Sequence, residues 1–167
     1  AGQPPTNFQG LIDVSTAFDF NGAALTITGA GTNDIDGTMS ITNSGTFTLD
    51  ELSLLTVGTL TQDGTGSNVI GDDITADIGG ITFAETVTLT SGTAGDTIVF
   101  TTSADSQAIN FDDTGNSILI ADDENLTLVA GNAGANSGNI GVDGVVNFGT
   151  AGDLTVTRGL TTTFAKA

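Results

Sequence analysis

Adjacent aspartates are the residues of this chain whose type and spacing could support chemistry. There are three such pairs, at Asp72 and Asp73, Asp112 and Asp113, and Asp122 and Asp123. Two carboxylates can cleave a glycosidic bond when they face each other across it. Neighbouring residues of a strand point to opposite faces, however, so an adjacent pair does not converge on one bond unless a turn redirects it. The pairs therefore do not predict a glycosidase.

Other catalytic residue types are scarce. The chain has no His, no Cys and one Lys, Lys166, whereas nucleophilic and general acid–base sites mostly use these residues or a tuned carboxylate. A lyase that acts on an acidic polysaccharide needs cationic groups to bind its substrate, and the sequence offers only Arg158 and Lys166. We expect a protein that is not an enzyme and that requires no cofactor.

The acidic turns suit one metal ion, calcium. Ca²⁺ binds about six to eight oxygen atoms, which carboxylates, Asn side chains and backbone carbonyls supply. The candidate ligands are Asp112, Asp113, Asp122 and Asp123, which stacked coils would bring close together. The alternative is a set of solvated turns, because Asp and Asn favour turns through hydrogen bonds to their own backbone. The EF-hand and glycine-rich nonapeptide patterns are both missing, and the two interpretations stay open.

Short β-strands are the elements that must carry these turns. Thr, Val, Ile and Phe favour strands, while 24 Gly and many Asn and Asp residues favour tight turns. Good helix formers are nearly absent, so we expect almost no helix. Alternating apolar residues predict strands within 11–20, 24–29, 38–43, 46–55, 80–90, 97–102, 108–113, 117–122, 125–130, 145–149 and 154–159.

These segments recur with a regular spacing. Val87, Ile109, Leu126, Val146 and Thr163 lead successive apolar–x–apolar matches at steps of about 17 to 22 residues. A second series, Ile81, Ile98 and Ile118, is offset from the first, which suggests two strands per repeat. One coil of a parallel β-helix uses roughly 20 residues, so the spacing favours that fold. Residues 1–62 do not keep this period.

The second half of the chain resembles a known group of proteins. The strings GITFAETVTL, GDTIVFTT, QAINFDDTGNSILI and ENLTLVAGN are similar to coils of large secreted bacterial β-strand-repeat proteins of the filamentous haemagglutinin and autotransporter passenger type. The resemblance covers about residues 70–165 and implies a parallel β-helix, or β-solenoid, on the cell surface. The resemblance lies in the pattern of residue types and not in a motif, because such coils share no invariant catalytic residues.

The competing architecture is an antiparallel β-sandwich or jelly roll of the pilin type, with about ten strands at 8–12-residue spacing. In either case the chain is expected to be all-β, and its 167 residues suit a single domain. We expect that domain to span residues 21–167.

Residues 1–20 predict an extended arm followed by one amphipathic strand. Two prolines extend the chain, and then Ile12, Val14, Phe18 and Phe20 alternate with polar residues. Such a strand could leave its own subunit and complete the sheet of a neighbour, as in β-strand addition, with these four residues as the subunit contact. The alternative is an ordinary first strand or cap.

Charge limits the partners that this chain could bind. Twenty carboxylates against two cationic side chains give a net charge of -18, which repels nucleic acid and anionic membrane surfaces. No apolar run approaches the roughly 20 residues of a membrane-spanning helix, so we expect no membrane insertion. The first residues, AGQPP, fit the start of a mature exported protein. We therefore expect an acidic protein that is secreted or on the cell surface.

Two functions fit these observations. The first is a non-catalytic extracellular structural protein, a pilus-like subunit that polymerises with copies of itself into a surface filament or fibre. The second is an adhesin or binding module from a larger secreted β-repeat protein, which would contact a cell surface or extracellular matrix and which calcium could stabilise. The first should assemble with itself, whereas the second should remain monomeric.

Overall fold

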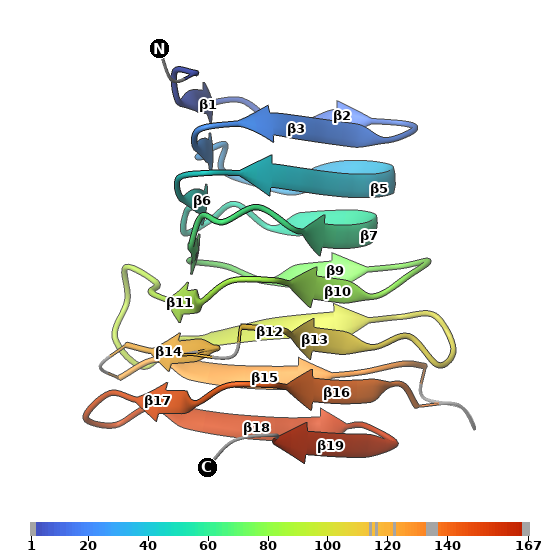
Figure 1. Cartoon of the computed structure of the whole chain (residues 1–167), viewed down its shortest axis with the longest axis vertical. Helices are drawn as coiled ribbons and strands as arrows, with labels where there is room; N and C mark the ends of the chain where they lie inside the picture. Colours follow the sequence, from blue (N-terminus) through green and yellow to red (C-terminus); the bar gives the residue numbers. More distant parts are fainter. Residues whose placement is uncertain (1–2, 114, 116, 122, 133–136, 165–167) are drawn as a thin grey trace.

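The chain folds into a stack of β-strand coils (Figure 1). The structure is a computed structural model that describes residues 3–113, 115, 117–121, 123–132 and 137–164. Within these residues it contains nineteen strands and no helix. The coils follow one another along the long axis, from the N-terminal coil at the top of Figure 1 to the C-terminal coil at the bottom. The fold is an all-β parallel β-helix.

One side of the stack, face 1, is a seven-stranded sheet to which each coil contributes one short strand. Its strands in spatial order are β1 (Thr6–Phe8), β4 (Leu25–Ile27), β6 (Phe47–Leu49), β8 (Asn68–Ile70), β11 (Val87–Leu89), β14 (Ile118–Ile120) and β17 (Val146–Phe148). The stack therefore has seven described coils.

The other two sides belong to one twelve-stranded sheet. Face 2 holds β2 (Asp13–Val14), the first halves of β5 (Asn33–Asn43) and β7 (Leu55–Gln62), and then β9 (Ile74–Ala76), β12 (Thr97–Thr102), β15 (Asn125–Val129) and β18 (Asp153–Arg158). Face 3 holds β3 (Phe18–Gly22), the second halves of β5 and β7, and then β10 (Ile81–Phe83), β13 (Ile109–Phe111), β16 (Asn139–Val142) and β19 (Thr161–Phe164). In the second and third coils one long strand serves both faces.

Alternation along each strand decides which residues enter the interior. In most three-residue strands the first and third side chains are buried and the middle one is partly exposed, as in Ile81-Thr82-Phe83. Successive side chains of a strand point to opposite faces, so Ile, Leu, Val and Phe fill the core while Thr points outward. Parallel pairing in register then stacks like residues in columns through the molecule. One continuous apolar core results.

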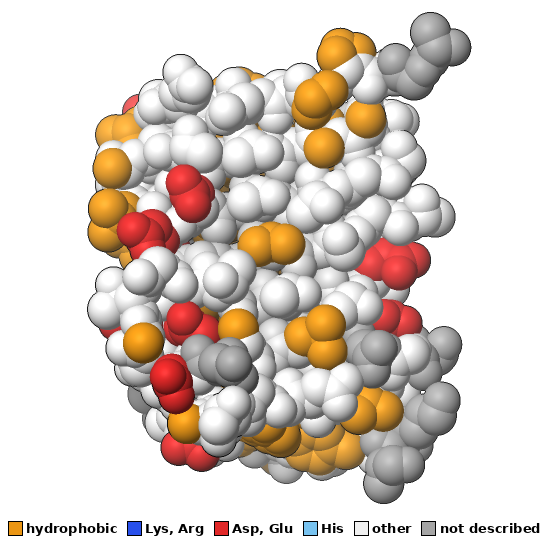
Figure 2. Space-filling view, turned by 90° about the vertical axis from the view of Figure 1, so that its left-hand side faces the viewer, with side chains coloured by type: hydrophobic (Ala, Val, Ile, Leu, Met, Phe, Trp, Pro, Cys, Tyr) orange, Lys and Arg blue, Asp and Glu red, His pale blue; other side chains and the backbone are white. Residues whose placement is uncertain are grey.

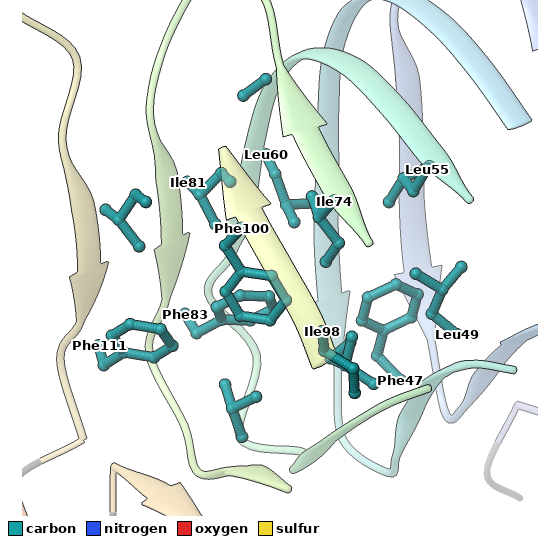
Figure 3. Packing of buried hydrophobic residues seen from close by; sticks show 14 of the residues in the cluster. Phe47, Leu49, Leu55, Leu60, Ile74, Ile81, Phe83, Ile98, Phe100 and Phe111 are labelled. Carbon is teal, nitrogen blue, oxygen red and sulfur yellow. The ribbon is translucent and has the colours of Figure 1, made fainter. Parts of the chain in front are cut away.

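Three phenylalanine rings pack together within this core (Figure 3). Phe83 lies 5.9 Å from Phe100 and 6.0 Å from Phe111 between ring centroids, and Phe100 lies 6.1 Å from Phe111. The rings come from β10, β12 and β13, so they tie face 2 to face 3 across two consecutive coils. Burial of rings this large supplies much of the stability of such a core.

The strand pairing excludes the β-sandwich. Every pairing between named strands of the described residues is parallel. Within the described residues, an isolated bridge between Gly131 and Ser137 is antiparallel. A sandwich or jelly roll needs antiparallel sheets. The prediction of a parallel β-helix is therefore confirmed.

The predicted repeat unit was wrong in its details. The strands of face 1 begin at residues 6, 25, 47, 68, 87, 118 and 146, so the first four steps are 19 to 22 residues and the last two are 31 and 28. Residues 1–62 thus keep the 20-residue coil better than the second half does. Val87, Ile109 and Leu126 lie on faces 1, 3 and 2, and the residue equivalent to Val87 in the next coil is Ile118. The predicted series takes every second strand of a coil that has three faces.

The N-terminal segment belongs to the same stack. The predicted single strand at 11–20 is wrong, because the chain turns a corner between β2 and β3. Strand β1 pairs with β4, and both β2 and β3 pair with β5, so residues 6–22 form the first coil. The pairing places no boundary at residue 20 between an arm and a domain.

Candidate assembly surfaces

The structure separates the predicted calcium ligands. Asp112 and Asp113 follow β13 at the corner between faces 3 and 1, whereas Asp123 lies between β14 and β15 at the corner between faces 1 and 2. Asp122 lies outside the described residues. Within the described part of the chain, no group of three or more His, Cys, Asp or Glu side chains is placed to hold a metal ion. Of the described candidates, Asp112 and Asp113 lie at a different corner from Asp123.

The aspartates at these corners have structural partners instead. Asp113 accepts a hydrogen bond from the Thr86 hydroxyl at 2.7 Å and another from the Gly115 amide at 2.8 Å. Asp112 follows Phe111, and Asp143 follows Val142, which is the partner of Phe111 in the next coil. Burial raises the pKa of Asp112, and the charge on Asp143 raises it further. The carboxylates of Asp112 and Asp143 therefore disfavour each other's charged form at this corner.

The carboxylates of Asp72 and Asp73 also accept hydrogen bonds from backbone amides. Asp73 accepts a hydrogen bond from the amide of Val99 in the next coil at 2.7 Å, and its own amide donates to the carboxylate of Asp72 at 2.7 Å. Burial raises the pKa of Asp73, although the bond from Val99 lowers it and the charge on Asp72 raises it. One carboxylate is bonded to the neighbouring coil and the other to the local turn, so the two do not face a common bond.

A buried polar cluster lies at the corner between faces 3 and 1, and it was not predicted from the sequence. Gln62 donates from its side-chain amide to Asn43 Oδ1 at 2.8 Å, and to the carbonyls of Gly64 at 3.0 Å and Gly66 at 3.1 Å. Asn68 donates to the carbonyl oxygen of the Gln62 side chain at 3.3 Å. This cluster satisfies the backbone of a tight corner, as buried polar groups usually do. Asn43 and Gln62 each stand two residues before a glycine, Gly45 and Gly64, and this spacing was the available signal.

The four residues predicted as a subunit contact lie in the first coil. Ile12 is buried, whereas Val14, Phe18 and Phe20 are partly buried and pack against the core from one side. Phe8 joins them, with its ring centroid 5.7 Å from that of Phe18. These side chains point toward the core of their own chain. Among the described residues, β1, β2 and β3 each pair on one side alone, so this end of the sheets has unpaired edges.

The last described coil leaves the opposite end of the core open. Val146, Phe148, Leu154, Val156 and Phe164 occupy register positions whose partners in the preceding coil are buried. Phe148 nevertheless exposes 51 % of its surface and Phe164 exposes 50 %. Figure 2 shows hydrophobic side chains gathered along this lower end of the molecule. Strands β17, β18 and β19 have described partners on one side only.

Comparisons with known proteins identify no relative, because no family model, curated protein or solved structure matches the chain. The described residues include no helix that is long and apolar enough to cross a membrane. Among the described residues, the unpaired strand edges and exposed apolar side chains of the first and last coils are the surfaces on which a functional proposal can rest.

Proposed function

We propose that this chain is an extracellular, non-catalytic structural protein that serves as the subunit of a self-assembling surface filament or fibre. The observations that carry the proposal are the unpaired strand edges at both described ends of the stack and the exposed core positions of the last described coil, which would face partly buried ones on the first coil of a second copy. Unpaired edges are templates for pairing with another chain. A second copy that continues the stack would pair these edges and bury the apolar residues.

Parallel pairing supports growth in one direction. Each coil follows the previous one with its strands in the same orientation, so the last coil offers the first coil of another copy the pairing that it offers within the chain. A contact between two different surfaces of the same molecule is heterologous, and it produces an open filament when the rotation does not close a ring. Solenoid repeats contact only their neighbours, so added copies extend the same architecture.

The charge distribution supports contact through the ends and not through the sides. The net charge is -18, and many carboxylates lie at the corners along the stack, among them Asp50, Asp77, Asp96, Asp105 and Asp123. Like charges on adjacent copies disfavour lateral packing, most strongly at low ionic strength. The largest group of exposed apolar side chains lies instead on the last described coil.

The proposal is tested with purified protein by sedimentation velocity and negative-stain electron microscopy over a range of concentrations. We expect filaments above a critical concentration. Phe148→Asp should abolish them, because it places a charge on the open core at the C-terminal coil. The matched control is Ile78→Asp, which changes a side chain that is 64 % exposed on the side of the stack, and it should leave assembly unchanged.

A protein that stays monomeric at every concentration contradicts the filament proposal. It would favour the second function, an adhesin or binding module from a longer β-repeat protein.

A further inference from the structure

The columns of the sheets show which residues would meet if one copy continued the stack of another. On face 1 one column of inward residues runs from the first coil to the last through Phe8, Ile27, Leu49, Ile70, Leu89, Ile120 and Phe148. On face 3 a second column runs through Phe20, Ile41, Gln62, Phe83, Phe111, Val142 and Phe164. Both columns begin and end on phenylalanine, so continuation in register would place Phe148 on Phe8 and Phe164 on Phe20.

A third column, on the outside of face 2, carries opposite charges at its two ends. It runs through Asp13, Asp34, Thr56, Thr75, Thr101, Val129 and Arg158. The register of β15 and β18 shifts between Leu128 and Val129, so Arg158 joins the column after an irregularity in the pairing. Arg158 is one of only two cationic side chains in the sequence. Its position on the last described coil, in the column that Asp13 begins, makes the two ends of this column opposite in charge.

A cationic partner would stabilise Asp13, because another carboxylate lies next to it. Asp13 and Asp34 are exposed and occupy adjacent rungs of the same column, and like charges directly opposite each other on paired strands are destabilising. A cation on the next rung would offset this repulsion. Among the described residues, Arg158 donates a hydrogen bond to the carbonyl of Gly131 at 3.0 Å, and a guanidinium carries five N–H donors in all.

We infer that copies of this chain join head to tail in register, with Arg158 of one copy paired with Asp13 of the next beside two phenylalanine contacts. The partner is a second copy of the same chain, and the inference rests on the proposed function. The apolar contacts would supply most of the affinity, while the charged pair fixes which column of one copy meets which column of the other, as charge complementarity does at interfaces.

Charge reversal tests the pairing. Asp13→Arg and Arg158→Asp should each raise the critical concentration for assembly by about threefold to tenfold, since an exposed pair is replaced by repulsion. The double variant should restore assembly to near the wild-type value. The matched control is Asp19→Arg, which makes the same change in net charge on the same coil, because the column of Asp19 ends at Thr163. This control should not weaken assembly.

Cross-linking tests the register directly, because the chain has no Cys of its own. Asn7 and Asn147 begin and end one outward column of face 1, and within one copy six rungs of roughly 4.8 Å separate them. Across the proposed joint they would lie on adjacent rungs, about 4.8 Å apart, within the range for a disulfide. Oxidation of the Asn7→Cys, Asn147→Cys variant should give a covalent ladder of multimers. The pair Asn7→Cys, Thr163→Cys joins different faces and should not.

The outcomes separate this inference from the function on which it rests. Wild-type protein that never assembles overturns both. If filaments form equally well with Asp13→Arg and Arg158→Asp, the filament proposal stands and the proposed register is wrong. The same conclusion follows if the mismatched cysteine pair forms cross-links. Each variant is first checked for an unchanged melting temperature, so that a loss of assembly is not a loss of fold.

Discussion

At the scale of single residues, glycines at the corners set how closely successive coils approach. A Cβ atom at Gly66 would overlap the carbonyl oxygen of Gly45 in the preceding coil, whereas a Cβ at Gly10 would meet nothing within 4 Å. The clash at Gly66 involves backbone, which cannot move aside without breaking the corner. Sequence composition indicated turns at such positions but did not show which glycines are in contact between coils.

We predict that Gly66→Ala lowers the free energy of unfolding by about 2–3 kcal/mol, since overpacking against fixed backbone costs energy of this size. Urea denaturation measures the change. Gly10→Ala is the control and should alter stability by less than about 0.5 kcal/mol. Equal effects of the two substitutions would show that contact between the coils is not what requires glycine at position 66.

The raised pKa of Asp112 gives stability a specific pH dependence. The folded state holds this proton more tightly than the unfolded chain does, where the carboxyl has its ordinary pKa of 3.8. The resulting stabilisation is complete below pH 3.8 and is lost as the pH rises through the raised pKa of the folded state. Both burial and the charge on Asp143 act in this direction.

Asp112→Asn should therefore raise the melting temperature at pH 7 by about 1–2 °C, and the difference should disappear near pH 3. Differential scanning calorimetry at both pH values tests this. Asp143→Asn should act in the same direction at pH 7, because it removes the second charge. A lower melting temperature for Asp112→Asn at pH 7 would contradict the argument.

At the scale of elements, sequence reasoning identified the strands better than the coil. Segments such as 97–102 and 80–90 contain observed strands, β12 in the first case and β10 with β11 in the second. The alternation of apolar and polar residues is local, because each strand shows it within its own few residues. The coil is different, because strands on all three faces share the same apolar–x–apolar pattern, and a spacing between similar strands does not show which of them stack.

The candidate sites were predicted less well for the same reason. Whether Asp112 lies near Asp123 depends on which corner each occupies, and that follows from the number of faces per coil. Gln62 reads as a surface amide in the sequence, yet it occupies an inward position between Ile41 and Phe83. Long-range register determines these placements, and a single sequence without an established coil length does not reveal it.

The phenylalanine columns predict two separable effects of truncation. Phe111→Ala should lower the free energy of unfolding by about 3–5 kcal/mol, because it leaves a cavity beside Phe83 and Phe100. Phe164→Ala removes a half-exposed ring from the same column. It should cost less than about 1 kcal/mol in stability while it weakens assembly. Denaturation and sedimentation measured on both variants test this, and an unchanged critical concentration for Phe164→Ala would count against the proposed joint.

At the scale of the whole molecule, the proposed filament forms by stacking along the coil axis. The seven described coils repeat at the spacing of hydrogen-bonded strands, about 4.8 Å. A filament that continues this stack should therefore add one subunit for roughly every 34 Å of length, with its strands perpendicular to the filament axis.

Electron cryo-microscopy of the assembled protein is the most direct test of this central claim. We predict filaments with an axial rise of roughly 34 Å per subunit and a strong meridional repeat near 4.8 Å. Protein that remains monomeric throughout, or filaments whose strands run along the axis, would contradict it.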